Sequence, residues 1–120
     1  MKFLWTTLQV MDLDESVGFY QDIVGLKLNQ RHFAGPGIEM AFLGEGDTQV
    51  ELICNKNNIK ANNGEGITIG FKVDSLEETM KIINEKGITV TKDIFKPNPH
   101  VQFFFVNDPN GFQVQFVEQM

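Results

Sequence analysis

Only a few side chains in this sequence combine a chemically useful group with a position inside an apolar segment. They are Trp5 in FLWTTLQV, Glu51 in QVELI, Thr68 in ITIGF and Gln115 in QVQFV. A carboxylate can take up a proton, a hydroxyl or an amide can hydrogen-bond a ligand, and an indole can stack on a planar group. The four residues therefore indicate a small polar site in which Glu51 is the candidate catalytic base.

Strand alternation places these residues on one face of a sheet. Read as a strand, residues 3–10 put Trp5 and Thr7 on one side and Leu4 and Leu8 on the other. The apolar side, which we expect a helix to cover, carries Leu4, Leu8, Val10, Val50, Leu52, Val114 and Phe116. The opposite side carries Trp5, Thr7, Gln9, Gln49, Glu51, Thr68, Lys72, Gln113 and Gln115.

A hollow face that mixes aromatic rings with a few polar groups is typical of a ligand pocket. The sequence therefore predicts that the Trp5 face binds a small molecule. Four phenylalanines are expected to line or close this pocket, namely Phe33, Phe42, Phe103 and Phe105. For each of these residues, ordinary core packing is the alternative. For Thr68 and Gln115, the alternative is a hydrogen bond that holds Glu51 in place.

Two helical segments show how the face would be positioned. Residues 12–25 (DLDESVGFYQDIVG) and 74–87 (DSLEETMKIINEKG) each have an aspartate able to cap the start, acids in the first turn and a closing glycine. They align at an offset of 63 residues, and EMAFL and QVELI then match QFFFV and QVQFV. The chain is therefore expected to be a duplication in which each half reads strand, helix, strand, strand, strand.

We accordingly expect an α+β fold in which two tandem βαβββ units form a curved mixed sheet around a cavity. The expected single domain covers residues 1–120, with repeats at about 1–56 and 66–120. The polar stretch 55–66 reads as the connector between them, and 33–37, 44–48 and 107–111 read as loops or turns.

The segments DLDESVGFYQDIVGLKL and FFFVNDPNGFQVQFVE, within paired βαβββ units, resemble the vicinal oxygen chelate superfamily, and glyoxalase I (lactoylglutathione lyase) in particular. The resemblance covers essentially the whole chain. It implies the paired βαβββ fold, a small-molecule ligand and a homodimer. In glyoxalase I it would also imply a divalent metal ion and an isomerase or lyase acting on a 2-oxoaldehyde–thiol adduct.

The metal positions of that family are only partly kept. Carried over by register, they fall on Trp5, Glu51, Thr68 and Gln115, where glyoxalase I has His, Glu, His or Gln, and Glu. An indole has no metal-binding lone pair, and one carboxylate with two neutral oxygens is a poor site for Zn²⁺ or Ni²⁺. Gln115 also cannot replace the family's proton-transfer glutamate. We therefore expect no metal and no cofactor.

Composition narrows the function classes further. The net charge of −6 argues against a nucleic-acid groove, and no apolar run reaches the roughly 20 residues that cross a bilayer. Cys54 is the only cysteine and is expected to be a small buried residue; His32, His100 and Arg31 are expected to be structural or surface groups. Without a signal-peptide pattern, the expected location is cytoplasmic.

The sequence leaves three functions open. The first is a metal-independent small-molecule pocket that binds a ligand or carries out unidentified chemistry. The second is a metal-dependent lactoylglutathione lyase. The third is a structural module whose cavity is filled by its own aromatic side chains. The sequence alone does not decide whether the chain is an enzyme.

Overall fold

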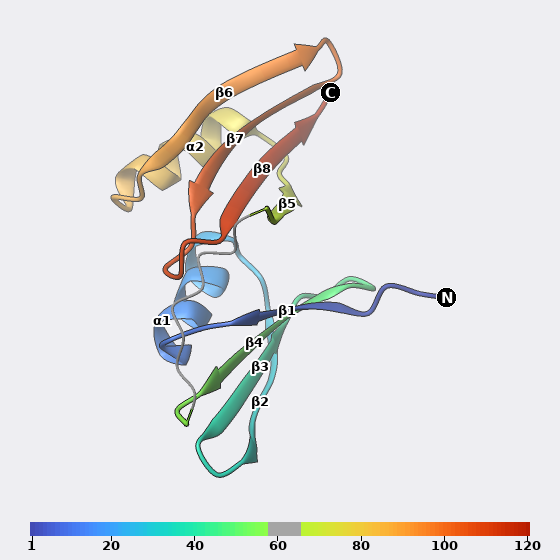
Figure 1. Cartoon of the computed structure of the whole chain (residues 1–120). Coiled ribbons are helices and arrows are strands. Elements are labelled where there is room, and N and C mark those ends of the chain that lie inside the picture. The colour runs from blue at the N-terminus through green and yellow to red at the C-terminus, as the bar shows by residue number, and fades with distance from the viewer. Residues whose placement is uncertain (58–65) are drawn as a thin grey trace. The chain divides into compact units, whose positions relative to one another are not determined.

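The computed structural model describes residues 1–57 and 66–120 (Figure 1). Its elements are β1 (Trp5–Gln9), α1 (Leu13–Gly18), the π-helix η1 (Phe19–Ile23), β2 (Leu28–Gly35), β3 (Ile38–Leu43), β4 (Gln49–Asn55), β5 (Thr68–Lys72), α2 (Leu76–Glu85), β6 (Val90–Asn98), β7 (Val101–Asn107) and β8 (Gln113–Gln119). Each half therefore has the predicted order of strand, helix and three strands. Most of the predicted connector at 55–66 lies outside the described residues.

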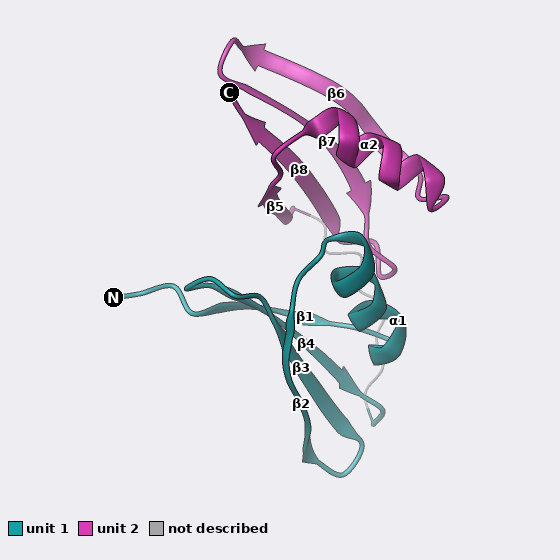
Figure 2. Ribbon diagram, turned by 180° about the vertical axis from the view of Figure 1, so that it is seen from behind, with its two compact units in different colours: residues 1–62 teal, residues 63–120 magenta. Residues whose placement is uncertain are grey.

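The chain divides into two compact units, residues 1–62 (unit 1) and 63–120 (unit 2), coloured separately in Figure 2. Each unit has one four-stranded mixed sheet, ordered β1-β4-β3-β2 in unit 1 and β5-β8-β7-β6 in unit 2. The first pair of strands is parallel and the other pairs are antiparallel. The predicted α+β architecture is thereby confirmed, while the cavity and the single-domain assignment stay predictions.

The strand register repeats between the units. In unit 1, Thr7 of β1 lies opposite Glu51 of β4. In unit 2, Gly70 of β5 lies opposite Gln115 of β8. The predicted equivalence of Glu51 and Gln115 is therefore an equivalence of position within the two sheets.

One face of each sheet is covered by the unit's own helix and forms its core. The buried residues on these faces include Leu8, Val50 and Leu52 in unit 1 and Val114 and Phe116 in unit 2. Burying apolar surface of this kind is the main stabilising contribution to folding. We call the opposite side of each sheet its open face.

Leu4, which we expected in this core, is 54% exposed. It precedes β1, and burial on its side of the strand increases only toward Leu8 and Val10. Leu4 therefore lies beyond the part of the sheet that is covered. Alternation alone predicted the correct side of the strand for Leu4, but it could not predict how much of the sheet the helix covers.

The first helical segment is shorter than predicted and changes its geometry. Asp12 caps α1 by accepting a hydrogen bond from the backbone N–H of Glu15, 3.1 Å away. The α-helix then passes into η1, whose wider turn lets the consecutive residues Phe19 and Tyr20 both be buried. Regular 3.6-residue spacing did not predict this pair.

The cap of α2 differs from the expected one. Ser75, not Asp74, accepts the hydrogen bond from the backbone N–H of Glu78, at 3.2 Å. Both helical segments are followed by the predicted closing glycines, Gly25 and Gly87, at φ of 84° and 73°. A left-handed residue of this kind is a common way to end a helix.

Two of the expected loops can be compared with the structure in detail. In the turn 107–111, Asp108 accepts hydrogen bonds from the backbone N–H groups of Asn110 and Phe112 at 2.8 and 2.9 Å. Only part of the expected loop 33–37 is a loop, because β2 continues to Gly35 and β3 begins at Ile38.

Within the described residues, no helix is long and apolar enough to span a membrane.

Candidate functional site

Glu51 lies near the middle of β4 on the open face of unit 1 and is only 6% exposed. Thr7 on β1 and Phe42 on β3 lie directly opposite it on its two sides. The hydroxyl Oγ1 of Thr7 donates a hydrogen bond to Oε1 of Glu51 at 2.6 Å. This bond offsets part of the cost of burying a charged group and leaves Oε2 as an acceptor for a ligand.

Aromatic rings lie on the same face of the sheet as Glu51. Trp5 meets Phe42 edge to face, with ring centroids 5.5 Å apart and planes at 80°. His32 stacks on Phe42 with centroids 6.4 Å apart and planes at 9°. Phe42 is buried, whereas Trp5 is 45% exposed and has surface free for a planar ligand. The structure thus places Trp5, Thr7, Phe42 and Glu51 on one face of the sheet, with His32 beside Phe42. Their role as a site stays a prediction.

The open face of unit 2 carries the remaining predicted residues. Gln115 lies between Phe105 on β7 and Gly70 on β5 in the strand register. Phe103 and Phe105 meet edge to face with centroids 5.6 Å apart. The hydroxyl of Thr68 donates a hydrogen bond to the side-chain carbonyl of Gln113. Thr68 therefore has a partner on its own sheet, which differs from the alternative in which it holds Glu51.

The residues at the expected metal positions do not fit a divalent ion. Trp5 offers no lone pair, and Thr68 donates its hydroxyl hydrogen to Gln113. Glu51 supplies the only carboxylate of the four positions. In addition, no group of three His, Cys, Asp or Glu side chains converges anywhere in residues 1–57 and 66–120. Zn²⁺ and Ni²⁺ sites in proteins need several nitrogen, sulfur or anionic oxygen ligands, and this set does not provide them.

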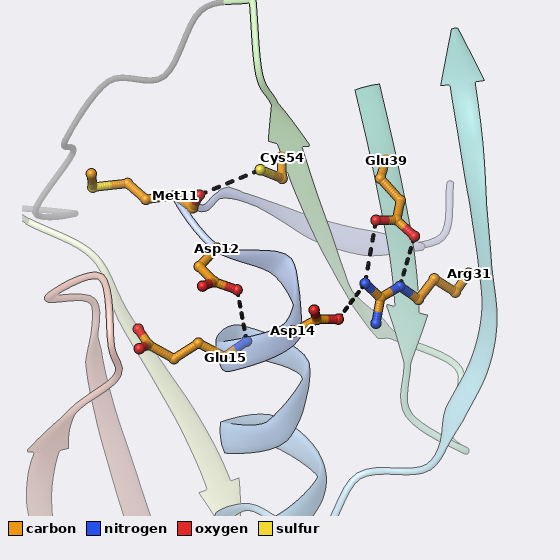
Figure 3. Close-up of polar contacts among 7 residues, drawn as sticks. All are labelled: Met11, Asp12, Asp14, Glu15, Arg31, Glu39 and Cys54. Atoms are coloured by element: carbon orange, nitrogen blue, oxygen red, sulfur yellow. Dashed lines mark hydrogen bonds and ion pairs between the residues drawn. The ribbon is translucent and has the colours of Figure 1, made fainter. Parts of the chain in front are cut away.

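A hollow lies on the helix side of unit 1, at the start of α1. Figure 3 shows the polar contacts of several residues that line it. Its volume is about 270 Å³, and Arg31, Glu39, Asp14, Cys54 and Phe33 are among its lining residues. Phe33 was expected near Glu51, but its 67% exposed ring lies at this hollow instead. The reason is alternation, since Phe33 pairs with Glu39, which faces α1.

Three of the charged side chains at this hollow, Arg31, Glu39 and Asp14, are paired with one another. Arg31 donates to both carboxylate oxygens of Glu39, with Nε 2.8 Å and Nη2 3.2 Å from them, and to Asp14 at 2.6 Å (Figure 3). The hydrogen bonds to Glu39 and then Asp14 raise the pKa of Arg31, and the bond from Arg31 lowers the pKa of Glu39. The thiol of Cys54 donates to the backbone carbonyl of Met11 at 3.5 Å. This cluster fastens the start of α1 to β2 and β3.

Comparison with known proteins identifies the family. A protein-family model, described as the Glyoxalase/Bleomycin resistance protein/Dioxygenase superfamily, matches residues 2–116. The chain belongs to this superfamily. Its similarity to individual members covers nearly the whole chain, so both βαβββ units take part in the relationship.

Curated relatives in the superfamily include lactoylglutathione lyases. The enzyme of that name from Haemophilus influenzae is 35% identical over 127 residues, covering 98% of this chain and 93% of the relative. That from Neisseria meningitidis serogroup A is 31% identical and covers 99% of this chain and 91% of the relative. This chain therefore shares ancestry with proteins of that name.

Solved structures support the same fold. A maize glyoxalase I mutant superposes with a TM-score of 0.84 at 26% identity, covering 97% of this chain and 44% of that one. This chain thus spans less than half the length of the maize protein. TnmS3, an antibiotic-binding protein from Streptomyces, has a TM-score of 0.76 at 16% identity, covering 100% of this chain and 97% of that one. At that identity the likeness concerns the fold alone.

Proposed function

We propose that this chain binds a small organic molecule without a metal ion and that Glu51 is the central polar contact. The observation that carries the proposal is the buried Glu51 carboxylate, fixed on one oxygen by Thr7 and bordered by Trp5 and Phe42. A pocket of this kind uses aromatic surface for affinity and a few polar atoms for orientation. If the bound molecule reacts, Glu51 is positioned to act as the general base.

Metal independence is supported by the donor set. Only one of the four family positions holds an anionic oxygen, and Trp5 presents an aromatic ring in place of a ligand atom.

As the resemblance implies, we further propose that the protein is a homodimer. Light scattering coupled to size-exclusion chromatography tests that assembly through the measured molar mass.

A second candidate is the metal-dependent lactoylglutathione lyase reaction. The specific observation in its favour is 30–35% identity to curated proteins of that name over nearly the whole chain. This candidate requires a functional divalent-metal site despite the residues at the four family positions.

Calorimetric titration of chelator-treated protein with Ni²⁺, Zn²⁺, Co²⁺ and Mn²⁺ separates the two candidates. We expect no stoichiometric binding at micromolar metal and no turnover of a methylglyoxal–glutathione mixture. Tight binding of one ion per chain, together with turnover, would establish the second candidate and overturn metal independence.

The role of Glu51 is tested by ligand binding. Trp5 is the only tryptophan, so its fluorescence reports directly on the open face of unit 1. Small aromatic and anionic metabolites are first screened by thermal shift, and the hits are titrated against Trp5 emission. We expect Glu51→Gln to weaken binding by about tenfold, because a charged hydrogen-bond acceptor is replaced by a neutral amide. The matched control is Glu45→Gln, at an exposed turn position; equal effects of both substitutions would remove Glu51 from the site.

A further inference from the structure

The open face of unit 2 is locally basic although the whole chain is acidic. The strand register places on this face Thr68, Gly70, Lys72, Lys92, Phe95, Val101, Phe103, Phe105, Gln113, Gln115 and Val117. These positions contain two lysines and neither aspartate nor glutamate, whereas the net charge of the chain is −6. The adjacent carboxylates lie elsewhere: Asp93 lines a hollow beside α2, and Glu118 accepts a hydrogen bond from the backbone N–H of Leu76.

Lys92 concentrates this positive charge beside an aromatic surface. It pairs with Phe105 across β6 and β7, and its Nζ lies 5.1 Å from the centre of the Phe105 ring. Among the described residues, no carboxylate lies within ion-pair distance of Lys92. The ammonium group is thus held at the ring while its charge stays available to an anion.

The rings beside Lys92 form a continuous aromatic surface. Phe103 lies 5.6 Å from Phe105 and 5.9 Å from Phe95, in both cases edge to face. Phe103 and Phe105 are partly exposed, and Phe95 is 59% exposed. Edge-to-face neighbours let a planar ligand stack on one ring while it meets the edge of the next.

Gly70 leaves room for the side-chain amide of Gln115 in the row of cross-strand neighbours that also contains Phe105 and Lys92. Gly70 lies opposite Gln115, and a Cβ at position 70 would lie 3.3 Å from Oε1 of Gln115. The row across the sheet therefore reads Lys92, Phe105, Gln115 and Gly70. It presents a cation, an aromatic ring and an amide within three neighbouring strands.

We propose that the open face of unit 2 binds a planar aromatic carboxylate. The ring of the ligand stacks on Phe103 and meets the edge of Phe105, its carboxylate pairs with Lys92, and the amide of Gln115 donates the remaining hydrogen bond. A planar aromatic cation is disfavoured because Lys92 already occupies the site with positive charge. This assignment rests on the proposed small-molecule function and specifies the ligand class of one of its surfaces.

The experiment uses 2-naphthoate, its neutral amide 2-naphthamide and the cation 2-naphthylmethylammonium as probes of one ring system. Each is titrated into the ¹⁵N-labelled full chain and followed by amide chemical shifts. We expect 2-naphthoate to bind best and to shift β6, β7 and β8 resonances. Lys92→Met should weaken 2-naphthoate binding by about fivefold, the size expected for a largely exposed ion pair. The matched control is Lys81→Met. Lys81 is an exposed lysine on α2, the helix that covers the opposite face of the same sheet.

A cycle of ligand and residue changes isolates the charge contribution. In the wild-type protein the carboxylate should bind about fivefold more tightly than the amide, and in Lys92→Met the two should bind equally. Phe105→Leu, which keeps an apolar side chain, should weaken all stacked probes. An unchanged preference for the carboxylate in Lys92→Met would overturn the assignment.

The outcomes also separate this inference from the proposed function. If 2-naphthoate shifts only residues around Glu51, or if it fails to bind while other screened molecules bind in a Glu51-dependent manner, the inference is overturned and the proposed function is supported. If neither the naphthyl probes nor any screened molecule binds, both are overturned. A 2-naphthoate site that depends on Lys92 but not on Glu51 supports the inference and shows that the two faces bind independently.

Discussion

Thr7 holds Glu51 across two parallel strands, with the threonine hydroxyl 2.6 Å from the carboxylate oxygen Oε1. The equivalent pair in unit 2 is Gly70 and Gln115, in which the hydroxyl is absent and the carboxylate has become a neutral amide. The carboxylate of Glu51 thus has a hydroxyl donor on the opposite strand, whereas the amide of Gln115 has a glycine without a side chain on the opposite strand. The two units have diverged at this row into surfaces of different charge.

Loss of the Thr7 hydroxyl should destabilise unit 1. Thr7→Val keeps the branched shape but leaves a buried carboxylate without this donor, which costs about 1–3 kcal/mol. Urea denaturation followed by Trp5 fluorescence measures the change. Thr7→Ser keeps the hydroxyl and should lose clearly less stability; equal losses in Val and Ser variants would show that the hydrogen bond contributes little.

Residue alternation predicted much of the site from the sequence. The residues on the open face of β1 and β4 were assigned correctly, because the regular register of these strands lets a period of two locate each side chain. The duplication also identified Glu51 and Gln115 as equivalent positions. These predictions depended only on strands without irregularities.

Two residues of the open face of unit 2 lie where that regularity breaks. In β6, register shifts occur between Val90 and Lys92 and between Lys92 and Phe95, so Lys92 and Phe95 share a face although they are three residues apart. A bulge inserts an extra residue on one strand, and no period of two can anticipate it. His32 was missed for another reason: its place beside Phe42 follows from the pairing of β2 with β3, which the sequence does not specify.

Capping provides a direct test of the second helix. Ser75→Ala removes the side chain that accepts the hydrogen bond from Glu78 and should cost about 1 kcal/mol of stability. Asp74→Ala, at the position favoured by the sequence, is the matched control and should have a smaller effect. Thermal unfolding by circular dichroism compares the two, and a larger loss in Asp74→Ala would contradict the observed cap.

Gly70 should be replaceable without loss of fold. Its φ is not in the left-handed region, so Gly70→Ala restricts the unfolded chain and is expected to change stability by less than about 1 kcal/mol. The new Cβ would displace the Gln115 amide, which lies 3.3 Å away. We therefore expect altered amide side-chain NMR signals of Gln115 with little change in melting temperature. An unchanged Gln115 signal would show that its side chain does not lie over Gly70.

The Arg31 cluster should make unit 1 sensitive to acid. The hydrogen bonds from Arg31 hold the pKa of Glu39 below its ordinary value of 4.5, so this pairing stabilises the folded state above that value. The contribution is lost as the pH falls through the lowered pKa, because Glu39 is then protonated. Arg31→Met should therefore lower the melting temperature by about 2 °C at pH 7, as expected for a surface ion pair, and by less at pH 3. Arg31→Lys keeps the charge but not the planar fork and should fall between the two proteins; a deficit that stays constant from pH 7 to pH 3 would assign the effect of Arg31 to packing of its side chain instead of to its charge.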